Sequence, residues 1–161
     1  MGRCFGRLLP LLPVLFFACT STGATGWEHI GNVQRIERLK DGVELTAENA
    51  KVRVSFFRDG VVRVRVGYKG IFPKDYSWAV IETPEPPSVS LKEEQEEIRL
   101  SSGGIVVQVK KSPLLINFLD SAGNVIVADE PSLPMAWNGS RVEVWKKMPL
   151  LENYYGLGDR A

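Results

Sequence analysis

The fold of this 161-residue chain is decided by one stretch, Lys51-Val52-Arg53-Val54-Ser55-Phe56-Phe57-Arg58-Asp59-Gly60-Val61-Val62-Arg63-Val64-Arg65-Val66. Apolar and polar residues alternate on both sides of Asp59-Gly60, which is the pattern of a β-strand with one buried and one exposed face. An Asp-Gly pair between two such runs is a strong hairpin signal, because glycine accepts the backbone conformation of a tight turn. The stretch therefore predicts an antiparallel β-hairpin with valines on one face and arginines on the other.

The same pattern recurs on both sides of this hairpin. Upstream, Asp41-Gly42 separates two alternating runs, and downstream Asp120-Ser121-Ala122-Gly123-Asn124 turns the chain between two more. Further strands are predicted over residues 104–109, 114–119, 125–128 and 141–146. No segment after residue 32 has a convincing 3.6-residue apolar period over ten or more residues. Short strands joined by tight turns predict an all-β fold, an antiparallel β-sandwich.

Composition excludes several classes of function. The formal charge is +1, so the chain lacks the basic footprint of a nucleic-acid-binding protein. Hydrophobic residues make up 44% of the chain, enough for the core of one domain. Both cysteines, Cys4 and Cys19, lie near the N-terminus, and His29 is the sole histidine. The sequence therefore predicts no metal site built on cysteine or histidine, no disulfide framework and no cofactor.

The N-terminus has the order of a secretory signal. Arg3 and Arg7 precede an apolar run over residues 8–18, and small and polar residues follow. The run is shorter than the roughly 20 residues that a membrane-spanning helix needs. We therefore expect export, with residues 1–24 as the signal, residues 25–32 as a linker and residues 33–161 as the β-sandwich domain.

The end of the apolar run offers two cleavage sites. Leu15-Phe16-Phe17-Ala18-Cys19 resembles the cleavage box of bacterial lipoproteins, in which the cysteine becomes the lipidated first residue of the mature chain. Phe16 stands where leucine is usual, and conventional cleavage after Ala24 is the competing interpretation. Lipid on Cys19 predicts a cell-envelope lipoprotein tethered to a membrane, whereas cleavage after Ala24 predicts a periplasmic or secreted protein.

The carboxylates do not show the pattern of a catalytic pair. Glycoside hydrolysis needs two facing acids, one of them usually tuned by burial. Glu37, Glu44 and Glu143 alternate with apolar residues on predicted strands, which places them on a solvated face. The glutamates between residues 93 and 97 are interpreted as a solvated run, and the aspartates at 41, 59 and 120 as turn residues. The sequence thus predicts no catalytic residue.

Aromatic side chains are the more suggestive feature. Trp78 and Trp137 are candidate carbohydrate-binding residues, because the C–H faces of sugar rings suit aromatic π surfaces. Core packing is the alternative for each of them. Asn138-Gly139-Ser140 matches a glycosylation sequon, but an Asn-Gly dipeptide also favours a tight turn.

Four stretches carry a family resemblance. They are the hairpin over residues 52–66, the motif Ser77-Trp78-Ala79-Val80, the segment over residues 112–129, and the exit sequence that runs from Val144-Trp145 to Tyr154-Tyr155-Gly156-Leu157-Gly158-Asp159. They are similar to the N-terminal β-sandwich domain of glycoside hydrolase family 31, the α-glucosidase and α-xylosidase family. That family more often has glutamate where Asp159 stands. The resemblance covers most of residues 33–160 and implies a galactose mutarotase-like supersandwich, here partial.

The resemblance also implies a parent enzyme. In the family, a catalytic (β/α)₈ barrel follows the sandwich and hydrolyses α-glucosides or α-xylosides with two aspartates. A chain without that barrel is expected to be inactive, and its carbohydrate partner to bind through the missing part. Tyr155, Gly156, Gly158 and Asp159 are then expected to shape the junction with the barrel. A standalone carbohydrate-binding module and an envelope lipoprotein are the alternatives.

A sandwich that covers a barrel needs an apolar docking surface. We expect such a patch around Trp145, Met148, Leu150, Leu151 and Tyr154-Tyr155. Exposure of this patch predicts that the isolated chain self-associates or is marginally stable.

Overall fold

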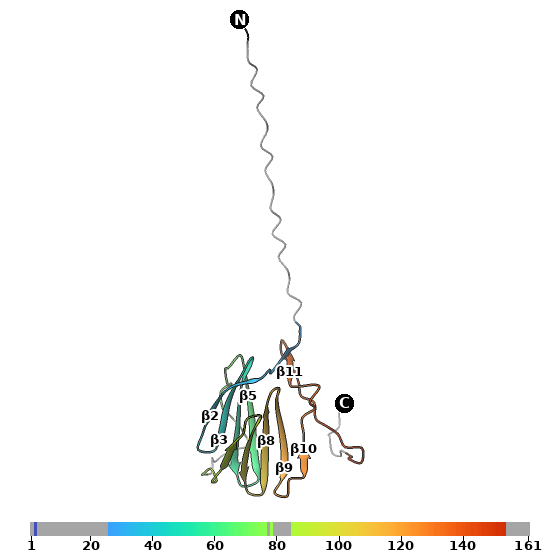
Figure 1. The fold of residues 1–161 in the computed structure, drawn as a ribbon. Helices are drawn as coiled ribbons and strands as arrows, with labels where there is room; N and C mark the ends of the chain where they lie inside the picture. Colours follow the sequence, from blue (N-terminus) through green and yellow to red (C-terminus); the bar gives the residue numbers. More distant parts are fainter. Residues whose placement is uncertain (1, 3–25, 77, 79–84, 154–161) are drawn as a thin grey trace.

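The computed structural model describes residues 2, 26–76, 78 and 85–153, and every regular element in them is a β-strand (Figure 1). The strands are β1 (Glu28–His29), β2 (Val33–Arg38), β3 (Gly42–Ala47), β4 (Ala50–Arg58), β5 (Val61–Tyr68), β6 (Ser90–Glu93), β7 (Glu97–Ser102), β8 (Ile105–Lys111), β9 (Leu114–Asp120), β10 (Val125–Val127), β11 (Ala136–Asn138) and β12 (Arg141–Glu143). They form three antiparallel sheets, in the orders β2-β3-β4-β5, β10-β9-β8-β7-β6 and β1-β11-β12. The prediction of an all-β, antiparallel fold is therefore confirmed.

The four-stranded sheet contains the hairpin that the alternating stretch predicts. Arg58 of β4 pairs with Val61 of β5, so Asp59 and Gly60 form a two-residue turn. Gly60 has a φ of +70°, which glycine adopts without a steric cost because it has no Cβ. The valines of β5 that follow pack against the core, and the arginines between them lie on the outer face of the sheet.

The core lies between the two larger sheets, which face each other (Figure 1). Each sheet contributes side chains from two neighbouring strands, and all of these are at most 1% exposed: Val43, Leu45, Val52, Val54 and Phe56 from one sheet, and Ile98, Leu100, Val107 and Val109 from the other. In both sheets the buried positions alternate with positions that are less buried. This alternation across two facing sheets defines a β-sandwich.

The five-stranded sheet contains a hairpin that the sequence pattern does not predict. β6 pairs with β7, so the acidic residues between 93 and 97 form two strand ends and the turn between them. The side chain of Glu97 is 16% exposed and accepts hydrogen bonds of 2.6 Å from both Arg99 Nε and Gln108 Nε2. The prediction of a solvated run is wrong for Glu97, because the donors of its own and the next strand take the place of water.

The three-stranded sheet lies at the end of the sandwich where the chain enters it (Figure 1). Glu28 and His29 of β1 pair with Trp137 and Ala136 of β11, and Ile30 is 1% exposed. Residues 28–30, which fall within the linker predicted over residues 25–32, thus contribute a strand to this sheet and a side chain to the core. A two-residue strand is too short to show alternation, and the partner of Glu28 lies 109 residues further along the chain.

The last predicted strand is shorter than expected. β12 ends at Glu143. Beyond it, the backbone of Lys146 forms an isolated β-bridge with the backbone of Asp129. The carboxylate of Asp129 accepts a hydrogen bond of 2.7 Å from the amide of Ile116 and pairs with the ammonium of Lys146. The Asp129 side chain therefore links the segment after β12 to β9. Two backbone hydrogen bonds, from Glu130 to Trp145 and from Lys147 to Ala128, join the same segment to the residues around Asp129.

Candidate functional site

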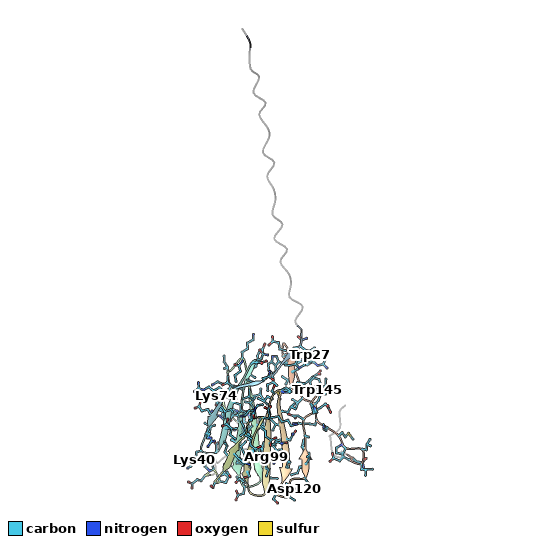
Figure 2. The ribbon with its side chains drawn as sticks, viewed as in Figure 1. Trp27, Lys40, Lys74, Arg99, Asp120 and Trp145 are labelled. Carbon is cyan, nitrogen blue, oxygen red and sulfur yellow. The ribbon has the colours of Figure 1, made fainter. Side chains whose placement is uncertain are left out.

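A strap over residues 71–76 runs along the outer face of the four-stranded sheet. Arg63 of β5 donates to both carboxylate oxygens of Asp75, at 2.7 and 3.0 Å. Arg65 donates to Asp75 at 3.2 Å and to the carbonyl of Pro73 at 2.6 Å. The ring of Phe72 packs against the guanidinium groups of both Arg53 and Arg65, each 5.4 Å from the ring centroid. Lys74 of the strap lies on the side of the molecule that this sheet occupies, and Trp145 on the opposite side (Figure 2).

Charge holds the strap in place. The hydrogen bond from the Arg63 guanidinium lowers the pKa of Asp75 below its ordinary value, and the nearby charges of Arg65 and Arg53 lower it further. The same bond raises the pKa of Arg63. Both groups are therefore charged at neutral pH, and the two-pronged contact fixes the orientation of the carboxylate as well as its position.

The strap leads into an exposed aromatic pair. Trp78 is 89% exposed and Tyr76 is 61% exposed, and their rings meet edge to face with centroids 5.0 Å apart. A sugar ring can stack only on an aromatic face that solvent reaches. Of the two predicted carbohydrate-binding tryptophans, Trp78 has that exposure.

Trp137 has a different environment. It is 3% exposed and belongs to the core cluster. Its indole Nε1 donates to Oε2 of Glu28 at 3.1 Å, and the hydroxyl of Tyr68 donates to the same oxygen at 3.4 Å. The rings of Trp137 and Tyr68 meet edge to face at 5.2 Å. The environment of Trp137 is that of core packing, which was the alternative to a sugar platform.

An apolar hollow of about 320 Å³ lies beside these two rings. Its lining is mostly apolar and consists of Val66, Tyr68, Met135, Trp137, Gly139, Ser140 and Val142. Asn138 pairs with Arg141, so Gly139 and Ser140 form the two-residue turn between β11 and β12, and the predicted Asn-Gly turn is confirmed. The hollow is therefore bounded by the last residues of β5 and by the β11–β12 hairpin.

Glu44 is less solvated than its position in the alternation predicts. Its side chain is 12% exposed, and its carboxylate lies 2.6 Å from Nη2 of Arg53 and 3.0 Å from Nζ of Lys51. The hydrogen bonds from Arg53 and then Lys51 lower the pKa of Glu44. The prediction of a solvated face is wrong for this residue, because two long side chains of the neighbouring strand β4 cover it.

The described residues do not provide a buried acid pair or a metal site. None of the described residues that are buried has a charged or polar side chain of the aspartate, glutamate, asparagine or serine kind; all of them are hydrophobic residues or glycines. Residues 26–76, 78 and 85–153 also hold no group of three or more histidine, cysteine, aspartate or glutamate side chains that could bind a metal ion. No helix in this part of the chain is long and apolar enough to cross a membrane.

The exit segment has the exposed apolar side chains that the sequence predicts. Met148 is 63% exposed, and Leu150 and Leu151 are 103% and 93% exposed, whereas Trp145 is half-buried. The prediction is confirmed for the first three of these residues. The other predicted positions lie outside the described residues: Cys19, Tyr154, Tyr155, Gly156, Gly158 and Asp159.

Three contributors to these sites were not predicted from the sequence. Glu28 and Tyr68 lie 40 residues apart, and neither local sequence indicates that their side chains meet. The contact of Asp75 with the two arginines of β5 could have been predicted, because Asp75 is an acidic residue shortly after the Arg-Val-Arg motif of that strand. If a loop covers the face of the strand that carries two arginines, their charges need an anionic partner within that loop.

The two facing antiparallel sheets define a β-sandwich, and this architecture is consistent with the galactose mutarotase-like class. Residues 51–161 match the profile of the glycosyl hydrolase 31 N-terminal galactose mutarotase-like domain, and the chain belongs to this family. The alpha-glucosidase 2 of Bacillus thermoamyloliquefaciens is 26% identical to it over 133 residues, which are 82% of this chain and 17% of that protein. The chain thus spans about a sixth of the length of this curated relative.

Solved structures share the fold. A family 31 dextranase of Flavobacterium johnsoniae, in complex with glucose, has a TM-score of 0.74 at 20% identity, over 83% of this chain and 17% of its own. The cycloalternan-forming enzyme of Listeria monocytogenes, in complex with a pentasaccharide substrate, has a TM-score of 0.55 at 16% identity, over 70% of this chain and 10% of its own. At these identities the likeness extends to the fold alone.

Proposed function

We propose that this chain acts as the non-catalytic N-terminal domain of an exported α-glucosidase-like glycoside hydrolase. The observation that carries the proposal is the family match over residues 51–161, in a chain that covers 17% of an α-glucosidase. In such an enzyme the acids that cleave the α-glycosidic bond belong to the part that follows the sandwich. The sandwich then supports chemistry that takes place elsewhere, and this chain alone is inactive.

The exit segment is the surface on which this domain meets the catalytic part. Leu150 and Leu151 are almost fully exposed, and an exposed apolar patch of this kind is typical of an interface. Tyr155, Gly156, Gly158 and Asp159 follow it directly in the sequence and shape the junction. The two glycines allow the close backbone approach that a tight domain junction needs.

The leader determines the location of the enzyme. Residues 1–24 direct export, and lipid on Cys19 tethers the protein to the cell envelope. Mass spectrometry of the mature protein tests this part of the proposal. A lipidated N-terminal Cys19 supports the tether, cleavage after Ala24 supports a periplasmic or secreted protein instead, and an intact Met1 contradicts export.

Activity assays test the central proposal. The purified chain is expected to release no chromophore from a chromogenic α-glucoside or α-xyloside. Turnover that rises in proportion to the concentration of the chain would show that its own residues are catalytic. The reading frame beyond the codon for Ala161 is the second readout, and a frame that lacks a barrel with two acids would contradict the proposed parent enzyme.

Carbohydrate binding is a second candidate function, favoured by the Tyr76–Trp78 pair. Both rings are exposed, and the ion pairs of Asp75 hold the strap that precedes them. Related dextranase structures contain glucose and isomaltotriose. Titration with isomaltotriose, followed by tryptophan fluorescence, is expected to saturate. Trp78→Ala removes the signal, while Trp27→Phe, at an exposed position outside the strap, keeps it; no saturation at millimolar sugar would exclude this function.

A further inference from the structure

β12 has a free backbone edge. It is the outermost strand of the three-stranded sheet, and among the described residues it pairs only with β11. Asn138 and Arg141 flank the two-residue turn, so they form the hydrogen-bonded pair, and the next pair, Trp137 and Val142, is a non-hydrogen-bonded one. The N–H and C=O groups of Val142 therefore point away from β11, toward the free edge.

The side chains of β12 form a short charge pattern. Val142 is 61% exposed and lines the apolar hollow, on the same face as Trp137. Arg141 and Glu143 lie on the opposite face, since side chains alternate along a strand. The two form an ion pair of 2.5 Å, and the Arg141 guanidinium lies 5.5 Å from the ring centroid of Trp27. The edge thus presents a cation, an apolar side chain and an anion in succession.

We propose that β12 is a homotypic interaction surface, which pairs antiparallel with β12 of a second copy of this chain, centred on Val142. In that register Arg141 stands opposite Glu143 of the partner subunit, and Glu143 stands opposite Arg141 of the partner subunit. Opposite charges directly across an antiparallel pair are stabilising, and like charges are destabilising. A parallel, in-register pair would instead set arginine against arginine. The order of charges along β12 is therefore complementary to a second β12 only when the two strands run antiparallel.

The same register covers apolar surface. The two Val142 side chains lie side by side across the two-fold axis, next to the two hollows, and each shields the other from water. The interface uses one surface on both copies, so it closes at a dimer. β12 has three residues, so the buried area is small and the association depends on concentration. β10, another edge strand with exposed apolar residues, has an irregular register with its neighbour β9 and offers a less regular ladder.

Sedimentation of the full chain over a concentration series tests the proposal. The wild-type chain is expected to form a dimer at high concentration and low salt. Arg141→Glu places two glutamates opposite each other, and Glu143→Arg places two arginines opposite each other, so each variant alone is expected to remain monomeric. An equimolar mixture of the two variants restores both opposite-charge pairs and is expected to form a heterodimer.

Three outcomes would overturn the proposal. They are a wild-type chain that stays monomeric at every concentration, single-charge variants that associate as the wild type does, and a mixture that associates no better than its components. The side chain of Arg141 is 73% exposed and that of Glu143 is 24% exposed, so unchanged melting by circular dichroism is needed to verify that each variant folds. The double variant Leu150→Ser/Leu151→Ser tests whether the chains associate through the exit segment instead. If this variant abolishes dimer formation while the charge variants of β12 do not, β12 is not the interface.

Discussion

Ser102 donates a hydrogen bond to Asp59 across the two sheets of the sandwich, with 2.9 Å between Oγ and Oδ1. Ser102 ends β7, and Asp59 lies in the turn between β4 and β5. Gly103, the next residue, packs so closely on that turn that a Cβ at this position would lie 2.4 Å from the amide nitrogen of Gly60. Two hairpin tips that are far apart in the sequence thus interlock.

Substituting Gly103 measures this contact. Gly103 and Gly104 both have positive φ, of 57° and 81°, but a Cβ at Gly104 would meet no atom within 4 Å. Gly104→Ala is expected to cost about 1 kcal/mol of unfolding free energy for the left-handed backbone alone. Gly103→Ala is expected to cost at least ~1 kcal/mol more, because the two turns must also separate. Urea denaturation provides both values, and equal losses would contradict the interlock.

The two candidate tryptophans differ in their effect on stability. Trp137→Ala removes a buried aromatic side chain from the core and is expected to cost about 3–5 kcal/mol. Trp78→Ala removes an exposed side chain and is expected to change stability by less than ~0.5 kcal/mol. Thermal and chemical denaturation of the two variants provide the comparison. A large loss for Trp78→Ala would place that ring in contact with the folded domain.

The ion pairs of Glu44 predict an acid-sensitive contribution to stability. Its folded-state pKa lies below the ordinary value of 4.5, because Arg53 and Lys51 stabilise the charged form. The contribution is therefore fully present above about pH 4.5 and is lost as the pH falls through the folded pKa. Glu44→Gln is expected to cost about 1–2 kcal/mol at pH 7, and this difference from the wild type is expected to shrink in acid.

A matched control for Glu44 is available on the neighbouring strand. Glu37 pairs with Arg35 at 3.9 Å, and both side chains are largely exposed. Glu37→Gln is expected to change the unfolding free energy by less than ~0.5 kcal/mol. Denaturant titrations at a series of pH values compare the two variants. A Glu44→Gln difference that stays constant from pH 7 into acid would show that the carboxylate charge is not the cause.

Release of the strap is expected to leave the sandwich folded. Asp75→Asn removes the charge that Arg63 and Arg65 bind. Hydrogen exchange at the amides of residues 71–76 should become faster, while melting of the domain changes little, since the Asp75 carboxylate in both pairs is about half exposed. Lys74→Met alters the neighbouring charge and serves as the control. Unchanged exchange in Asp75→Asn would show that Phe72 packing alone holds the strap.

The leucines of the exit segment are expected to limit solubility. Leu150→Ser/Leu151→Ser removes the two most exposed apolar side chains of the described residues. The variant should bind less of a hydrophobic dye and form fewer large aggregates than the wild type, at unchanged melting temperature. Light scattering and dye fluorescence measure both effects. Equal aggregation of the two proteins would place the adhesive surface elsewhere.

Hairpins were the part of this fold most accessible from the sequence. The Asp59-Gly60 turn and the runs around it lie within sixteen residues, so alternation and turn chemistry both act locally. The acidic hairpin between β6 and β7 is hard to predict from the sequence, because the dense charge of residues 93–97 obscures the short alternation in Glu97-Ile98-Arg99-Leu100. β1 was missed because two residues cannot show a period.

The candidate site was less accessible than the fold. Exposure separates Trp78 from Trp137, and exposure depends on which elements cover each ring. Both tryptophans fit the same compositional argument, so the sequence could not rank them. The hollow, the carboxylate of Glu28 and the strap all arise from contacts between strands and loops that are distant along the chain.

Local patterning was thus sufficient to predict most of the strands and their turns, the inward-facing valines and the family resemblance. These properties depend on the intrinsic preferences of neighbouring residues. Tertiary packing alone decided which acids are covered, which tryptophan reaches solvent and which strand edge stays open. Each of these depends on the order of the strands in the sheets, and hydrogen-bond pairing between distant segments sets that order.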